Sequence, residues 1–231
     1  MAQQRQRWGD IPVIVWGPDS DRVYLHVHGK QGRKEYARRF AELAAARGWQ
    51  TVSFDLPGHG ERSGGAPCDV WNGTADLLAV YDRARARWGT LALYACSLGA
   101  YLSLEALGGA TLTGALFQSP IVDMGWLVRR MMADAGVTEE ELRIRQRIPT
   151  PVDTLSWPWY CHIVAHPVTA WPHATRVLWA GHDTLQPRAV IDRFCERFGA
   201  DLTVAPDSDH PFMAPGDGPL VEAWLQEALL P

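Results

Sequence analysis

The five residues Ala95-Cys96-Ser97-Leu98-Gly99 give the strongest indication of how this chain folds. An apolar run over residues 90–94 precedes it, and a helical pattern over residues 100–107 follows it. A serine placed between a buried strand and a helix is typical of a sharp, strained turn that exposes the hydroxyl group. Such a turn needs small residues two positions away on each side, and Ala95 and Gly99 meet that need. Ser97 is therefore a candidate nucleophile, although a serine that only caps the following helix would also fit these five residues.

The length and composition are those of an ordinary globular protein. The chain has 231 residues, a length that fits one α/β domain with room for an inserted cap, and 47% of the residues are hydrophobic and 21% are charged. The net charge is −4 and no block of about five or more like charges occurs, which indicates neither a nucleic-acid partner nor an anionic membrane surface. No apolar stretch reaches the roughly 18 residues of a membrane span.

Two further features indicate a cytoplasmic location. The first eight residues lack the apolar core of a signal peptide. The four cysteines are far apart and show no CxxC spacing, which favours free thiols in a reducing compartment over disulfides or a zinc site. We therefore expect a cytoplasmic protein.

Short apolar runs alternate with helix-length patterns, which predicts a mostly parallel sheet with helices on both faces. Strands are expected over 11–16, 23–28, 51–54, 90–94, 114–118, 176–180 and 202–205, the first of them at the edge of the sheet. Between about Ile121 and Pro172 the alternation breaks, and proline and tryptophan become frequent. We therefore predict a core made of residues 1–120 and 173–231 and a small helical cap insertion over 121–172.

An acid and a histidine follow the last two predicted strands. Asp183 comes after the strand at 176–180, and His210 comes after the strand at 202–205. Functional groups of open parallel sheets gather beyond the carboxyl ends of the strands, and the order Ser97, Asp183, His210 is the one that accompanies such a serine turn. A serine hydroxyl needs a base, and the base needs an acid to orient it. Asp183 could instead be a turn residue and His210 a surface-loop residue, and Asp123 is the one serious substitute for Asp183.

An oxyanion needs hydrogen-bond donors that are fixed before reaction. The backbone N–H of Leu98, at the start of a helix, is one candidate, and the N–H of Lys30, in the glycine loop after the strand at 23–28, is the other. The Lys30 side chain itself is expected to be solvated. His26 and His28 alternate along this strand, but no third ligand at useful spacing follows, so we expect no metal site and no cofactor.

Taken together, these motifs resemble the α/β-hydrolase family over nearly the whole chain. The resemblance rests on His28-Gly29 after a strand, on Asp55-Leu56-Pro57-Gly58-His59-Gly60, on Ala95–Gly99, on Gly181-His182-Asp183 and on Asp209-His210. It implies that Ser97 is the nucleophile, Asp183 the acid and His210 the base, with the N–H groups of Leu98 and Lys30 as oxyanion hole. It also implies that residues 121–172 cover the site. Ala95 departs from the glycine usual at that position.

The predicted function is that of a metal-free serine hydrolase of the carboxylesterase or lipase type. Its partner would be a small-molecule acyl substrate. Thioester or carbon–carbon bond hydrolysis, acyl transfer to an acceptor other than water, and a catalytically silent binding module on the same fold are the alternatives.

Aromatic residues of the predicted cap suggest an apolar acyl pocket. The candidates for its lining are Trp126, Met131, Trp157, Trp159 and Trp171. Aromatic side chains are core material first, so the alternative is that these residues only pack the cap against the rest of the chain.

Overall fold

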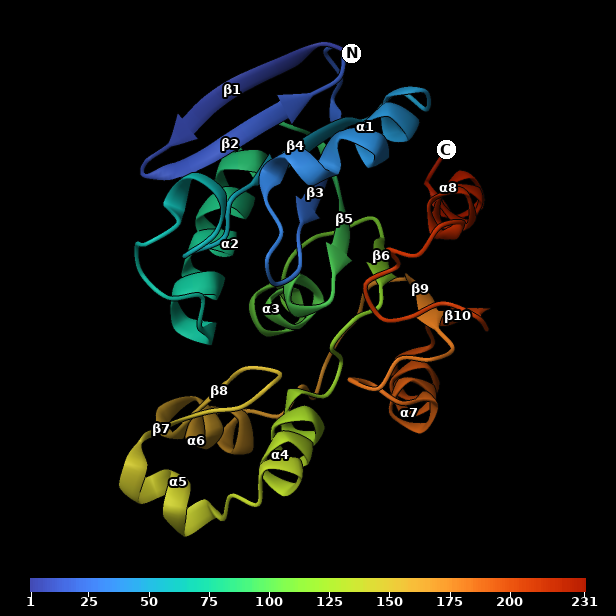
Figure 1. The fold of residues 1–231 in the computed structure, drawn as a ribbon. Helices are drawn as coiled ribbons and strands as arrows, with labels where there is room; N and C mark the ends of the chain where they lie inside the picture. The colour runs from blue at the N-terminus through green and yellow to red at the C-terminus, as the bar shows by residue number, and fades with distance from the viewer. The chain divides into compact units, whose positions relative to one another are not determined.

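The computed structural model describes residues 1–231, which divide into two compact units. The first unit consists of residues 1–122 and 170–231, and the second consists of residues 123–169. Figure 1 shows the elements of both units along the chain.

The first unit is built on one eight-stranded sheet with the strand order β1-β2-β4-β3-β5-β6-β9-β10. Every pairing from β4 to β10 is parallel, whereas β2 pairs antiparallel with both β1 and β4. The strands are β1 (Gln3–Trp8), β2 (Ile11–Trp16), β3 (Arg22–Val27), β4 (Gln50–Phe54), β5 (Thr90–Cys96), β6 (Ala115–Gln118), β9 (Thr175–Ala180) and β10 (Asp201–Ala205). The mostly parallel sheet predicted from the alternating pattern is confirmed.

The prediction that residues 11–16 form the edge of the sheet is wrong. Strand β1 lies outside β2 and pairs with it from Gln3↔Trp16 to Trp8↔Ile11. The side chains of β1 are glutamine, arginine and a single tryptophan, and most of them are exposed. A polar strand of this kind carries no alternating apolar signal, so the hydrophobic pattern does not reveal it.

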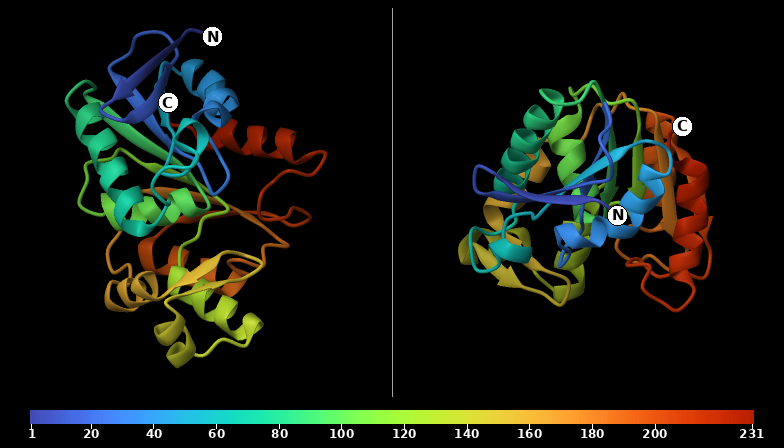
Figure 2. Two further views of the ribbon diagram at one scale, coloured as in Figure 1. Left: turned by 60° about the vertical axis from the view of Figure 1, so that its left-hand side comes forward. Right: turned by 90° about the horizontal axis from the view of Figure 1, so that it is seen from above.

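Helices cover both faces of the sheet. These are α1 (Arg38–Ala45), α2 (Val70–Arg85), α3 (Leu98–Leu107), α7 (Arg188–Phe198) and α8 (Asp217–Ala228), with short 3-10 turns at Lys34–Ala37 and Gly60–Arg62. In the right-hand view of Figure 2, α1 and α8 lie on one side of the sheet and α2 and α3 on the other. Two layers of helix thus shield a sheet whose central strands are apolar on both faces.

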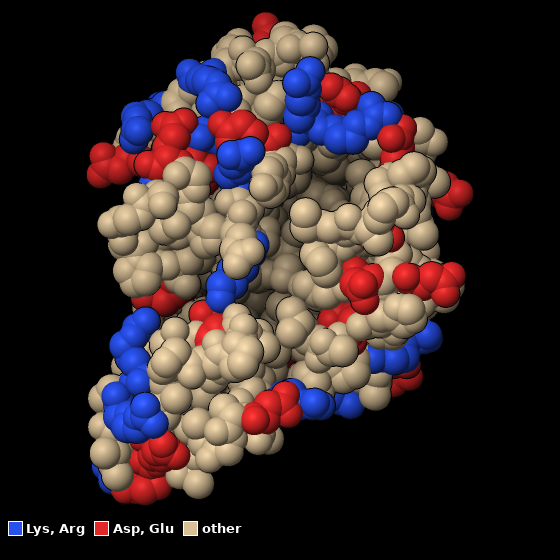
Figure 3. All heavy atoms as spheres, viewed as in Figure 1, with Lys and Arg blue, Asp and Glu red and all other residues tan.

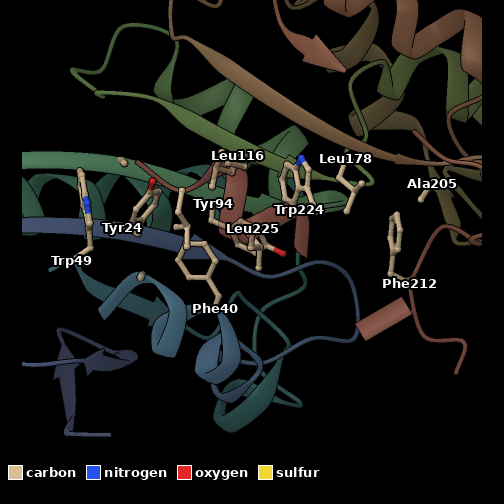
Figure 4. Close-up of a cluster of buried hydrophobic side chains, with 14 of the residues drawn as sticks. Tyr24, Phe40, Trp49, Tyr94, Leu116, Leu178, Ala205, Phe212, Trp224 and Leu225 are labelled. Atoms are coloured by element: carbon tan, nitrogen blue, oxygen red, sulfur yellow. The ribbon is translucent and has the colours of Figure 1, made fainter. Parts of the chain in front are cut away.

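The core on the α1 and α8 side is rich in aromatic residues. Phe40 of α1 stacks on Tyr94 of β5 with ring centroids 4.3 Å apart, and Trp224 and Leu225 of α8 belong to the same buried cluster. Figure 4 shows these side chains converging from the sheet and from the two helices. Burial of such large apolar surfaces is the main stabilising contribution to this packing.

The second unit contains three helices and a small two-stranded sheet. The elements are α4 (Met124–Ala135), α5 (Glu139–Arg145), β7 (Arg147–Pro149), β8 (Thr154–Ser156) and α6 (Trp157–Ala165). The side chain of Thr138 caps α5 by accepting a hydrogen bond from the Glu141 N–H at 3.1 Å. The pair β7 and β8 was not predicted, because three-residue strands beside prolines give no periodic signal.

None of the helices in either unit has the length and apolar character needed to cross a membrane.

Candidate active site

The turn at Ser97 has the strained backbone that its sequence predicts. Ser97 lies between β5 and α3 with φ 47° and ψ −117°, in a region that residues other than glycine rarely occupy. Position 99 requires glycine because it packs against the end of β3. A Cβ atom at this position would lie 2.6 Å from the carbonyl oxygens of both Val27 and His28. The tight packing of α3 on β3 therefore helps to fix the position of the serine.

Asp183 and His210 follow adjacent parallel strands, β9 and β10. The loops after these strands are tied together, because the N–H of His182 donates to the Ser208 carbonyl oxygen at 3.0 Å. The Asp183 side chain is buried, and its Oδ2 lies 2.7 Å from Nδ1 of His210. Nε2 of His210 lies 2.7 Å from Oγ of Ser97. The structure thus brings the three residues into one continuous chain of hydrogen bonds.

The hydrogen bonds around Asp183 determine which ring nitrogen of His210 carries the proton. Its Oδ1 accepts the backbone N–H groups of Leu185 at 2.8 Å and Gln186 at 3.0 Å. A carboxylate in this role is an acceptor at both oxygens, so Nδ1 of His210 carries the proton and donates it to Oδ2. Nε2 is then the unprotonated nitrogen, and it can accept the hydroxyl proton of Ser97.

The other acids considered from the sequence are placed differently. Asp123 caps α4, with its Oδ1 accepting the Trp126 N–H at 2.7 Å, in the role that capping aspartates usually have. Asp207 and Asp209 are exposed, and the nearest ring nitrogen of His182 lies 3.9 Å from Asp209. Only Asp183 makes a hydrogen bond to His210.

The glycine loop after β3 lies directly beside the serine. A Cβ atom on Gly29 would be 3.1 Å from the Cβ of Ser97, so only glycine fits there without displacing its neighbour. Gly29, Lys30, Ser97 and His210 all border one cavity of about 540 Å³. Leu98 is the first residue of α3, where backbone N–H groups have no partner within the helix. The loop and the helix start are thus close to Ser97, and the role of Leu98 and Lys30 as oxyanion donors stays a prediction.

His28 fixes the conformation of this loop. Its Nε2 accepts the Leu56 N–H at 3.1 Å, so the ring proton is on Nδ1, which donates to the Gly29 carbonyl oxygen at 2.8 Å. Burial lowers the pKa of His28 to about 4, which keeps the ring neutral and preserves this tautomer at neutral pH. Because the Gly29 carbonyl points to His28, the N–H of Lys30 in the same trans peptide points the opposite way.

A buried ion pair supports the loop from behind, and the sequence did not reveal it. Nζ of Lys34 lies 2.6 Å from Oδ2 of Asp55 and 2.8 Å from Oε1 of Glu61, and both Lys34 and Asp55 are almost completely buried. Asp55 also accepts the backbone N–H groups of Lys34 and Glu61. Lys34 stands between Arg33 and Glu35 in the sequence. Three consecutive charged residues usually indicate an exposed segment, so the sequence gives no sign that Lys34 is buried. The segment that begins at Asp55 thus has a structural role.

Replacing Lys34 by methionine should destabilise the fold strongly. The change would leave the Asp55 carboxylate buried without its cation, a loss of about 3–5 kcal/mol in the free energy of unfolding. Urea unfolding at neutral pH measures it. The control is Arg38→Met, which removes an exposed pair with Glu42 and should cost less than about 1 kcal/mol. Equal losses for the two variants would contradict the structural role of Lys34.

The same pair sets the sign of a pH dependence. Burial alone would raise the pKa of Asp55, but its hydrogen bonds to Lys34 and to the Glu61 N–H lower it below the usual range. A carboxyl group with a lowered pKa in the folded state contributes stability above its unfolded-state pKa and loses it as the pH falls through the folded-state value. The stability advantage of the wild type over Lys34→Met should therefore shrink in acid.

The five residues predicted to line an acyl pocket do not form one group. Trp126 and Met131 belong to α4, and Trp157 and Trp159 belong to α6, all in the second unit. Trp171 belongs to the first unit, where it is buried against Phe117 at 5.5 Å between ring centroids and donates from Nε1 to Thr175 Oγ1 at 2.7 Å. The role of these residues in a pocket stays a prediction.

Comparison with known proteins places this geometry in a family. A model of the alpha/beta hydrolase family matches residues 24–223 of the chain. Est1E from Butyrivibrio proteoclasticus, in a structure with bound ferulic acid, is similar at 15% identity and a TM-score of 0.78, covering 97% of this chain and 96% of that one. Alpha/beta hydrolase domain-containing protein 10 from mouse is similar at 14% identity and a TM-score of 0.78, covering 98% of each chain.

The esterase Pf2001 from Pyrococcus furiosus is similar at 18% identity and a TM-score of 0.67, covering 98% of this chain and 89% of that one. A search of curated proteins found no match. Likeness at such identities shows the fold, and the family follows from the match over residues 24–223. The resemblance deduced from the motifs is confirmed: this chain belongs to the alpha/beta hydrolase family.

Proposed function

We propose that the protein is a serine hydrolase that cleaves the carboxylic ester of a small, largely apolar substrate through an acyl-enzyme at Ser97. The observation that carries this proposal is the chain of hydrogen bonds from Asp183 through His210 to Ser97, with two links of 2.7 Å each. The Pyrococcus furiosus relative is an esterase, and the Est1E structure contains a bound carboxylic acid, ferulic acid. Both agree with an acyl substrate.

In the first half of the reaction, Nε2 of His210 accepts the Ser97 hydroxyl proton as the oxygen attacks the ester carbonyl. The negative charge that develops on the carbonyl oxygen is stabilised by the N–H of Leu98, at the positive end of α3, and by the N–H of Lys30. His210, now cationic, is held by the buried Asp183 carboxylate and gives its proton to the departing alcohol. The acyl group remains attached to Ser97.

In the second half, water takes the place of the alcohol. His210 accepts a proton from that water, whose oxygen attacks the acyl carbonyl, and Ser97 regains its proton as the acid departs. The residues of this scheme need no metal. Cys96, next to the nucleophile, does not compete, because burial raises the pKa of its thiol to about 11 and the thiolate is the reactive form.

Rapid mixing of the purified enzyme with p-nitrophenyl butyrate tests this scheme. An acyl-enzyme predicts a burst of p-nitrophenol that approaches one equivalent per chain when release of the acid is the slower step. Addition of hydroxylamine, a stronger nucleophile than water, should yield the butyryl hydroxamate. Hydrolysis without any trapping of the acyl group would contradict a covalent intermediate.

A further inference from the structure

The cavity beside Ser97 extends beneath α1 and α8. It has a volume of about 540 Å³, within the usual range of small-molecule sites. At one end it is bordered by Ser97 and His210, and at the other by residues of α1 and α8. Figure 3 shows a hollow on this face, between the segments that Figure 1 labels α1 and α8. All of its lining residues belong to the first unit.

The walls of this cavity are mainly apolar and aromatic. Phe40 of α1 and Tyr94 of β5 border it as a stacked pair, and Val221 and Leu225 of α8 border it from the helix opposite α1. Phe212, two residues after His210, adds a further ring. Surfaces of this kind favour an apolar occupant that can pack against flat rings.

The charges at the cavity are balanced or exposed. Nε of Arg39, on α1, donates to Oε2 of Glu222, on α8, at 3.0 Å, so these two side chains neutralise each other across the helices. Lys30 is exposed, close to the serine. Burial lowers the pKa of His26 to about 3, so its ring is neutral. The interior therefore offers no unbalanced charge to a charged occupant, for which burial without a partner would be costly.

The cavity floor carries hydrogen-bonding groups that the fold does not fully use. The side-chain oxygen of Gln118 accepts the hydroxyl of Tyr94, which leaves the amide nitrogen as a donor. Oγ of Ser119 and Nδ1 of His26 have no hydrogen-bond partner, although both residues are more than nine-tenths buried and both border the cavity. Buried polar groups of native proteins are normally satisfied, so unsatisfied ones beside a cavity point to an occupant.

We propose that this cavity holds the acyl group of the substrate, and that this group is uncharged, largely apolar and of medium length. The inference rests on the proposed function. The alcohol must leave beside His210, and water must then reach the same position, so that side of Ser97 has to open to solvent. The end of the cavity that lies between α1 and α8, away from His210, suits the part of the substrate that stays attached to Ser97.

The experiment compares kcat/KM for p-nitrophenyl hexanoate with kcat/KM for p-nitrophenyl acetate. The wild type should prefer the hexanoate by about tenfold or more, since each methylene group in an apolar pocket adds binding energy. Val221→Trp fills the cavity from α8 and should lower the hexanoate-to-acetate ratio by about tenfold. Ala223→Trp places the same side chain on the exposed face of α8 and should leave the ratio unchanged.

A second variant avoids disturbing the packing of α8. Gly218 borders the cavity in the first turn of α8, and a Cβ atom there would meet no other atom within 4 Å. Gly218→Phe should therefore fold and should also lower the ratio. If both filling variants keep the wild-type ratio, or if Trp159→Ala changes the ratio and they do not, the acyl group does not lie in this cavity.

Two further measurements separate the possible failures. For acetate esters of longer alcohols, Val221→Trp should change kcat/KM by the same factor as it does for p-nitrophenyl acetate, and a loss that grows with the length of the alcohol would mean that the cavity holds the alcohol instead. A p-nitrophenyl monoester of hexanedioic acid should be a poor substrate, because its carboxylate would lie in the interior of the cavity without an opposite charge. Efficient turnover would contradict the proposal that the acyl group is uncharged. A wild type that hydrolyses none of these esters would contradict the proposed function itself, whereas failure of the ratio test alone contradicts only the acyl site.

Discussion

Ser97→Ala should lower kcat for hydrolysis of p-nitrophenyl butyrate by about 10⁶-fold, leaving only the contribution of binding and of the oxyanion donors. The methyl group that replaces the hydroxymethyl group cannot attack the carbonyl, and His210 then has no hydroxyl to activate. The strained backbone at position 97 is set by β5, α3 and the close approach of Gly99 to β3, so the variant should keep its fold. Steady-state kinetics with a correction for spontaneous hydrolysis measures the loss.

Ser103→Ala is the matched control for this variant. Ser103 lies on the same helix, is buried, and donates from Oγ to the Gly99 carbonyl oxygen at 2.7 Å. It makes no hydrogen bond to His210, whose ring nitrogens are bonded to Ser97 and Asp183, and Ser103→Ala should retain hydrolysis. If Ser97→Ala kept the wild-type rate, the nucleophile would have to be another group and the proposed scheme would be wrong.

Asp183→Asn should lower kcat by about 10⁴-fold with little effect on KM. The amide oxygen can still accept the N–H groups of Leu185 and Gln186, so the amide nitrogen would face Nδ1 of His210. Nδ1 would then have to accept that hydrogen bond, and the ring proton would move to Nε2. In this tautomer His210 cannot take the proton of Ser97, although all three side chains keep their positions.

Asp209→Asn provides the comparison, because Asp209 is adjacent to His210 in the sequence, is exposed, and makes no hydrogen bond to its ring. It should keep the kcat of the wild type. A loss for Asp209→Asn as large as that for Asp183→Asn would contradict the specific role assigned to the buried carboxylate.

Local sequence patterns correctly predicted the strands and the helix around the site. The run before Ser97 and the helical pattern after it predicted β5 and α3, and the apolar runs at 176–180 and 202–205 predicted the strands that carry Asp183 and His210. Since those strands are parallel neighbours, their carboxyl ends lie at the same edge of the sheet as Ser97. The convergence of three distant segments was therefore predictable from the expected parallel direction of their strands.

What the patterns missed depends on contacts between distant residues. Strand β1 is polar, and it is held in the sheet by its pairing with β2. The bond from the Leu56 N–H to His28 and the burial of Lys34 against Asp55 join segments about 20–30 residues apart, and no periodicity reports such partners. The cavity under α1 and α8 arises from how two helices at opposite ends of the chain pack on one face, which no single stretch encodes.

Labelling with a fluorophosphonate, followed by peptide mapping by mass spectrometry, tests the central claim most directly. Such a reagent phosphonylates an activated serine through the same proton transfer to His210 that the ester reaction needs. We expect one adduct per chain, located on Ser97, with loss of activity in step with labelling. An enzyme that hydrolyses esters yet carries the adduct on another residue, or none, would rule out Ser97 as the nucleophile.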